Sequence, residues 1–201
     1  MLKLTLSHIL KEDIVGIQQI NDSAKLIEPQ NLDPKTLQEV DLIGIPDNAL
    51  ILSASGMSSS LFRENDSFCD CHTPSKYRKK CDYIVLTEFD HNNYIIYIEM
   101  KTSPRTQKYI PQLWCGRCFM EYLLFAISNL DNIQPSSNFI HRYVKFYRIP
   151  EDKDSTKLTD DEYKKPPKIK TFNDQPGKAY LCCVTAGIPI SIRDLIYEYN
   201  H

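Results

Sequence analysis

The chain has 201 residues, of which 42% are hydrophobic and 25% charged, a balance typical of a soluble globular protein with its own core. The net charge of −2 excludes a protein that is basic over its whole surface, so contact with a nucleic-acid backbone would need a local patch. No apolar run reaches the roughly 18 residues of a membrane span, and the N-terminus turns polar too early for a signal peptide. The seven cysteines, an odd number, indicate reduced thiols. We therefore expect a cytoplasmic protein that does not enter a membrane.

The first 45 residues predict one or two short helices. The clearest start is at Asp33-Pro34, where aspartate is a suitable cap and proline suits the first helical position. A short buried strand is expected over 49–52, and a loop of small residues follows over 53–60.

The centre of the chain predicts a β-hairpin. Residues 82–89 are rich in β-branched and aromatic side chains, residues 90–93 are polar, and residues 94–101 form the second predicted strand. A turn over 90–93 makes the numbers of paired residues add up to about 183, so that position 82 lies opposite position 101.

Hydrophobic periodicity past the hairpin predicts two helices and two more strands. They are a long helix over 107–129, a strand over 139–147, a strand over 178–185 and a terminal helix over 191–199. The order of elements predicts a single α/β domain over 1–201, with a central mixed sheet flanked by helices. Its core is expected over 36–150 and 178–200. The polar segment 151–177, which bears lysines and prolines, is expected to be a surface loop or insertion.

Three charged side chains meet at one end of the predicted hairpin. Side chains alternate along 94–101, so one face is apolar and the other ends in Glu99 and Lys101. Asp82 begins the neighbouring strand, one diagonal step from Glu99. Magnesium prefers oxygen ligands and usually takes one or two carboxylates, and a bound divalent ion polarises a phosphate and activates water. Asp82 and Glu99 fit that need.

Two neighbouring groups complete this predicted site. The main-chain carbonyl of Met100 lies between Glu99 and Lys101 and can supply another metal ligand. The Lys101 ammonium can approach the attacking water or the scissile phosphate. Beside two carboxylates it is expected to stay protonated, so it stabilises charge and does not act as a base.

The arrangement resembles the PD-(D/E)xK nuclease superfamily, whose pattern is an Asp on one core strand, Glu-x-Lys on the next and commonly a Gln on the following helix. Asp82, Glu99-Met100-Lys101 and Gln112 match that pattern within residues 80–130.

Two features depart from the family pattern. Cys81 stands where the family name implies proline, although that position is loose in the family. Many members also carry an acidic residue on an N-terminal helix, for which Glu39 and Glu64 are both candidates.

The resemblance implies a restriction-endonuclease-like fold and an endonuclease that depends on Mg²⁺ or Mn²⁺ and cleaves nucleic acid, DNA more readily than RNA. Asp82 and Glu99 would bind the metal, Lys101 would stabilise the transition state, and Gln112 would orient water or backbone. By analogy, we expect the effector subunit of a prokaryotic antiviral defence system, acting as a homodimer or with a partner subunit that supplies grip on DNA.

A group of cations before the hairpin is a candidate nucleic-acid contact. It consists of Lys76, Arg78, Lys79 and Lys80. Arg105, Lys108 and Arg117 extend this patch along the predicted helix. A solvated loop accounts for the first four cations equally well.

Two other functions remain open. A non-catalytic interaction subunit would keep a nuclease-like fold while a partner does the chemistry. A zinc-stabilised binding module would draw its ligands from Cys69, Cys71, His72, Cys81 and the Cys115-x-x-Cys118 pair. The first four are irregularly spaced and the pair falls within a predicted helix, so ordinary buried or half-buried thiols are expected.

Overall fold

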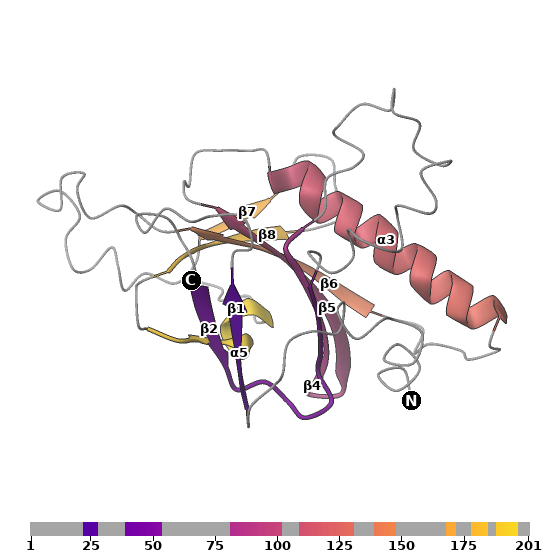
Figure 1. Ribbon diagram of the computed structural model, residues 1–201, viewed down its shortest axis with the longest axis horizontal. Helices are drawn as coiled ribbons and strands as arrows, with labels where there is room; N and C mark the ends of the chain where they lie inside the picture. The colour runs from indigo at the N-terminus through magenta and orange to yellow at the C-terminus, as the bar shows by residue number, and fades with distance from the viewer. Residues whose placement is uncertain are drawn as a thin grey trace, which may run out of the picture.

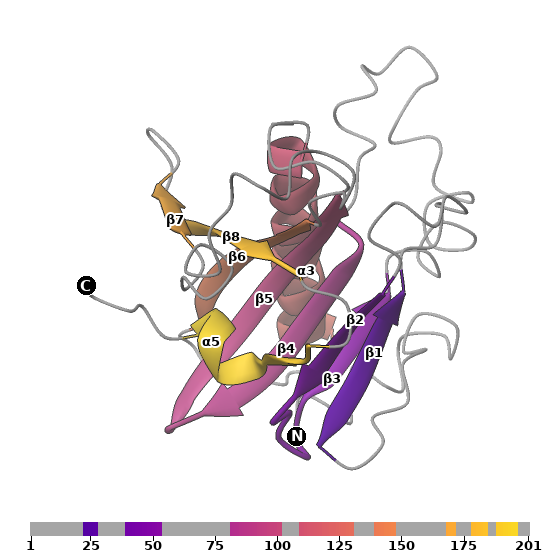
Figure 2. The same ribbon diagram turned by 90° about the vertical axis from the view of Figure 1, so that its left-hand side faces the viewer.

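The computed structural model describes residues 22–27, 39–53, 81–101, 109–130, 139–147, 168–171, 178–184 and 188–196. Within these ranges the chain forms a mixed α/β fold with two mixed sheets (Figure 1). Helix α3 (Tyr109–Leu130) covers one face of the larger sheet. The smaller sheet and the short helix α5 (Ile192–Ile196) lie on the opposite face (Figure 2). The predicted α/β class and central mixed sheet are confirmed, but the second flank is mainly a sheet where helices were expected.

The larger sheet contains all the strands predicted from residue 49 onward. Its strands, in spatial order, are β3 (Leu50–Ser53), β4 (Tyr83–Phe89), β5 (Asn92–Lys101), β6 (Phe139–Tyr147), β8 (Lys178–Cys183) and β7 (Lys168–Thr171). Strands β5, β6 and β8 run parallel to one another, and the other pairings are antiparallel. Strand β7 lies inside the segment 151–177 that was expected to be loop, and the rest of that segment is outside the described residues.

The hairpin turn is tighter than predicted. Phe89 pairs with Asn92, so only Asp90 and His91 connect the strands. Both have positive φ, 46° and 63°, which is the backbone of a type I′ turn. Such a turn matches the twist of the two strands and tolerates aspartate and histidine better than β-branched residues.

The shorter turn moves the register of the hairpin by two residues. Tyr83 pairs with Ile98, and continuing this register by one residue places Asp82 opposite Glu99, where position 101 was predicted. In this register Asp82 and Glu99 are direct cross-strand neighbours, whereas the sequence predicted a diagonal pair.

The smaller sheet has the order β1-β2-β9, formed by β1 (Ser23–Ile27), β2 (Glu39–Ile43) and β9 (Ile190–Ser191). The prediction of helix for the first 45 residues is wrong over β1 and β2. Their buried residues recur at every second position, as in a half-buried strand, but the exposed Ile27 and Ile43 interrupt the apolar pattern of the sequence. The expected helix start at Asp33-Pro34 lies outside the described residues.

Each face of the larger sheet has its own core. The face toward the smaller sheet packs β1, β2 and α5 against the apolar side chains of β4, β5 and β6. The Tyr83 hydroxyl links the two sheets, because it donates to the Ile27 carbonyl at 2.5 Å and accepts from the Ile27 amide at 2.9 Å. Helix α5 begins as predicted, with Ser191 Oγ accepting from the Arg193 amide at 3.3 Å.

The other face is covered by α3, whose buried positions form one stripe. The stripe consists of Tyr109, Leu113, Gly116, Met120, Leu123 and Ile127. Gly116 marks the closest approach, since a Cβ there would lie 2.5 Å from Cys81 Sγ. This close contact fixes the distance between α3 and the sheet at Gly116. No helix in the described part of the chain is long and apolar enough to cross a membrane.

Candidate active site

Asp82 is fixed in place by the neighbouring strand. The Met100 amide donates a hydrogen bond of 2.6 Å to Asp82 Oδ2. Burial raises the pKa of Asp82 above its ordinary value, although the Met100 hydrogen bond and the Lys101 ammonium both lower it. Burial therefore outweighs the two groups that stabilise the ionised form.

Glu99 is completely buried and forms an ion pair with Lys101 through its Oε1 atom. The Lys101 side chain is 26% exposed, whereas the carboxylate that it contacts is completely buried. Glu99 and Lys101 lie on the same side of β5, so their ion pair runs from the interior toward the surface of the protein.

The main chain of Met100 adds a third oxygen to this end of the hairpin. In an antiparallel ladder a residue directs its N–H and C=O toward the same neighbouring strand. The Met100 amide points toward Asp82, and its carbonyl therefore points the same way. The Met100 side chain is buried in the opposite core, where it holds the strand in position.

Lys145 is a functional candidate that nothing in the sequence singled out. It lies on β6 as the register partner of Glu99 and is completely buried. Its ammonium lies 4.4 Å from the ring centroid of Tyr109, the first residue of α3. Lys145 could be identified only from the parallel pairing of β5 with β6, and the sequence pattern does not determine that pairing.

Gln112 lies in the first turn of α3, half-buried and three residues after Tyr109. Residues three apart are neighbours on a helix, so Gln112 lies on the same side of α3 as Tyr109, whose ring contacts the Lys145 ammonium. The structure thus places Asp82, Glu99, Lys101 and Gln112 at the same end of the α3 face.

The predicted basic patch falls mostly outside the described residues. This applies to Lys76, Arg78, Lys79, Lys80, Arg105 and Lys108, and also to the candidate acid Glu64. The other candidate acid, Glu39, begins strand β2 and not a helix, and it forms an ion pair with Lys25 at 3.2 Å. Because the smaller sheet lies on the face opposite α3, Glu39 is not brought to the site.

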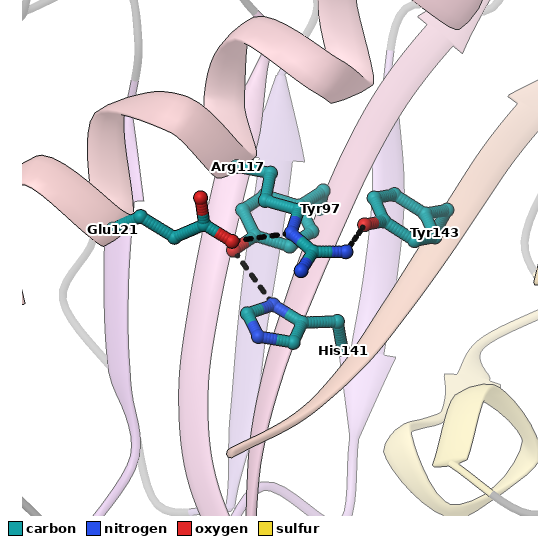
Figure 3. A network of polar contacts seen from close by, with 5 residues as sticks. All are labelled: Tyr97, Arg117, Glu121, His141 and Tyr143. Carbon is teal, nitrogen blue, oxygen red and sulfur yellow. Dashed lines mark hydrogen bonds and ion pairs between the residues drawn. The ribbon is translucent and has the colours of Figure 1, made fainter. Parts of the chain in front are cut away.

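A second polar cluster lies beneath the middle of α3 (Figure 3). Arg117 donates to the Tyr143 hydroxyl at 3.0 Å and forms an ion pair with Glu121 at 2.6 Å. The Tyr97 hydroxyl and His141 Nδ1 lie 3.0 Å apart in hydrogen-bonding contact. Burial lowers the pKa of His141, and the Arg117 charge lowers it further.

Arg117 was predicted to extend the basic patch, but its guanidinium is held by these contacts with the sheet and with its own helix. Burial lowers the pKa of Arg117, yet the hydrogen bonds to Glu121 and Tyr143 outweigh it and raise the pKa above its ordinary value. The guanidinium also lies 5.5 Å from the Trp114 ring centroid, so it is held on several sides. This cluster joins the helix to the sheet.

The cysteines that the structure describes do not form a zinc site. Cys81 is buried against Gly116, and burial, with the nearby Glu99 charge, raises the pKa of its thiol well above the ordinary value. Cys115 and Cys118 lie on α3 as reduced thiols, and the part of the chain described here contains no cluster of three metal-binding side chains. Cys69, Cys71 and His72 are outside the described residues.

The donor atoms at the end of the hairpin fit magnesium or manganese better than zinc. The carboxylates of Asp82 and Glu99 and the Met100 carbonyl are all oxygen donors, and each carboxylate can accept more than one contact. Magnesium keeps several of its waters, so two carboxylates are enough to hold it.

Comparisons of the chain with protein-family models, curated proteins and solved structures find no match. The family resemblance therefore rests on the residues of the site itself.

Proposed function

We propose that this chain is a metal-dependent nuclease of the PD-(D/E)xK type with a restriction-endonuclease-like fold. The observation that supports this most strongly is the grouping of Asp82, Glu99 and Lys101 at one end of the β4–β5 hairpin, with Glu99 completely buried and ion-paired to Lys101.

Burial of these charges favours a functional role over a structural one. Moving a carboxylate or an ammonium out of water costs several kcal/mol, and apolar residues of similar size often stabilise a protein as well or better. Yet Glu99 and Lys145 are both fully buried on adjacent strands, and Glu99 forms an ion pair with the partly exposed Lys101. Buried ionisable groups that converge at one place are typical of active sites.

The roles follow from the positions of the groups. Asp82, Glu99 and the Met100 carbonyl would hold Mg²⁺ or Mn²⁺, which would polarise the phosphate and lower the pKa of an attacking water. Lys101 would stabilise charge that develops on the phosphate, a role supported by its being the more exposed member of the ion pair. Gln112 would orient the water or the nucleic-acid backbone from the first turn of α3.

We infer DNA as the preferred substrate and expect help in binding it. The net charge of −2 supplies little general attraction for phosphate, so a homodimer or a partner subunit would provide grip and target choice. Cleavage of both strands also needs two sites. A role as the effector of a defence system is part of the same proposal and rests on analogy with small members of the family.

The test is a cleavage assay on duplex DNA, single-stranded DNA and RNA with Mg²⁺ or Mn²⁺ and an EDTA control. Wild type is compared with Glu99→Gln and Lys101→Ala. Glu88→Gln is the matched control, because Glu88 is an exposed carboxylate at the far end of the same hairpin. We expect metal-dependent cleavage that both site variants lose and the control keeps.

Cleavage that survives in both site variants would refute the proposed site. If the wild type binds nucleic acid but cuts none of the three substrates, the result would favour the non-catalytic interaction subunit.

A further inference from the structure

The end of the β4–β5 hairpin holds two cations as well as two carboxylates. Lys101 pairs with Glu99 on the same strand, and Lys145 is the register partner of Glu99 on β6. Because register partners of parallel strands share a face, Lys145 lies beside Glu99 under α3. This end of the hairpin thus carries equal numbers of acidic and basic side chains.

Lys145 has an aromatic neighbour that favours its charged form. Its ammonium lies 4.4 Å from the centroid of the Tyr109 ring, whose electron-rich face attracts a positive charge. Both Lys145 and Tyr109 are buried, with at most 1% exposed, so water does not screen this charge. The Tyr109 ring and the Glu99 carboxylate on the adjacent strand thus both favour a positive charge on Lys145.

A divalent ion bound between Asp82 and Glu99 would lie next to the strand that carries this second cation. Like charges in a poorly screened site repel strongly, and the repulsion lowers the affinity for the incoming ion. Lys101 is partly exposed and can turn its ammonium toward solvent, whereas the buried Lys145 has no such freedom.

We propose that Lys145 is a built-in counter-ion of Glu99 that keeps the metal-free site neutral and lowers its affinity for divalent metal. This inference rests on the proposed function, since it takes Asp82 and Glu99 as the metal ligands. Lys145 acts through Glu99 and is a positioning residue in this scheme.

The test is binding of Mn²⁺ alone to the full chain, followed by the electron paramagnetic resonance signal of the free ion. Lys145→Met removes the charge and keeps most of the length of the side chain. Lys145→Gln removes the charge but keeps a polar end, in case the Met variant does not fold. Lys25→Met is the matched control, because Lys25 is an exposed ammonium on the smaller sheet. Thermal unfolding checks that each variant is folded.

We expect both Lys145 variants to bind Mn²⁺ at least about tenfold more tightly than wild type, and Lys25→Met to bind it equally. A substitution that merely disturbed the structure of the site would weaken Mn²⁺ binding. Tighter Mn²⁺ binding would therefore show that the positive charge of Lys145 opposes the metal ion. Glu99→Gln should abolish Mn²⁺ binding both in the wild type and in the Lys145 variants.

The two proposals fail in different ways. Mn²⁺ binding that depends on Glu99 but is unchanged or weaker in both Lys145 variants would overturn the counter-ion role and leave the metal site standing. Absence of Glu99-dependent binding in every variant would overturn both.

Discussion

The Met100 amide donates to Asp82 Oδ2 at 2.6 Å, and this contact joins the carboxylate just before β4 to the strand that carries Glu99 and Lys101. This hydrogen bond from the main chain to a side chain lies just beyond the last backbone pair of the two strands, Tyr83 with Ile98. The two carboxylates are thereby held relative to each other before any ligand arrives, and such preorganisation is what a catalytic site requires.

Replacement of Asp82 by asparagine is expected to stabilise the metal-free protein at neutral pH. Burial raises the pKa of Asp82 in the folded state, so folding favours the protonated acid. Its contribution to stability is complete below the ordinary value of 3.8 and is lost as the pH rises through the raised pKa. Asp82→Asn should unfold at a higher temperature than wild type at pH 7 in EDTA. The difference should shrink as the pH falls toward 4, and a less stable variant at pH 7 would contradict this account.

Divalent metal is expected to reverse that order of stability. A ligand that binds only the folded state stabilises it by about 2.7 kcal/mol at a concentration one hundred times its Kd. Addition of Mn²⁺ should therefore raise the unfolding temperature of wild type and leave Asp82→Asn nearly unchanged. Thermal scans over a series of Mn²⁺ concentrations measure the effect. Equal stabilisation of the two proteins would place the metal elsewhere.

Loss of the Lys101 charge is expected to slow catalysis more than it weakens substrate binding. A group that stabilises charge in the transition state contributes about 10²- to 10³-fold to kcat. Lys101→Ala should lose activity of that order, with a much smaller change in KM. Steady-state kinetics on the substrate found in the cleavage assay give both values. A variant with raised KM and normal kcat would instead make Lys101 a binding residue.

The close approach of α3 to the sheet predicts that Gly116→Ala destabilises the protein. The same substitution in an open helix would stabilise it by up to about 1 kcal/mol. Here the new methyl group would lie 2.5 Å from Cys81 Sγ and 3.2 Å from Tyr97 Cδ1, and overpacking of this kind costs about 1–3 kcal/mol.

The double variant Cys81→Ala/Gly116→Ala serves as the control for this overpacking, because it removes the sulfur that the new methyl group meets. It should recover most of the loss, and chemical denaturation of the two single variants and the double variant measures the coupling between the positions. If the changes in the free energy of unfolding caused by the two single substitutions simply add in the double variant, the side chains at positions 81 and 116 are not in contact.

The cluster beneath the middle of α3 is expected to weaken in acid. Burial and the Arg117 charge lower the pKa of His141 below 6.5, so folding favours the neutral ring. The stabilisation that His141 provides is present above pH 6.5 and is lost as the pH falls through the lowered pKa. A titration of the His141 ring by NMR should show a midpoint below 6.5, and Arg117→Met should move it upward. A wild-type midpoint at or above 6.5 would contradict the structure.

The strands that carry the candidate site could be predicted because their signals are local. The β-branched run before Asp90, the polar turn and the alternation that ends in Glu99 and Lys101 all lie within twenty residues, and the structure confirms both strands. The turn itself was predicted too long. Its length depends on Asp90 and His91 adopting positive φ, which the residue types permit but do not require.

Features that depend on distant pairing could not be predicted in this way. Strands β1 and β2 have only five residues each, too few for a clear period, and β1 becomes a strand by pairing with β2. Lys145 looked like an ordinary polar position in an alternating strand until the parallel pairing with β5 placed it next to Glu99. A single sequence gives the alternation of a strand but not its neighbour or its register.

The parallel arrangement of β5, β6 and β8 has a consequence for how such a protein can diversify. The register aligns Lys101, Tyr147 and Cys183, so all three strands end at one edge of the sheet, the edge where Asp82 enters β4. Connecting segments accept insertions and substitutions far more readily than the strands they join. Sequence changes in the connections at this edge can therefore accumulate while the ladder of strands keeps positions 82 and 99 in register.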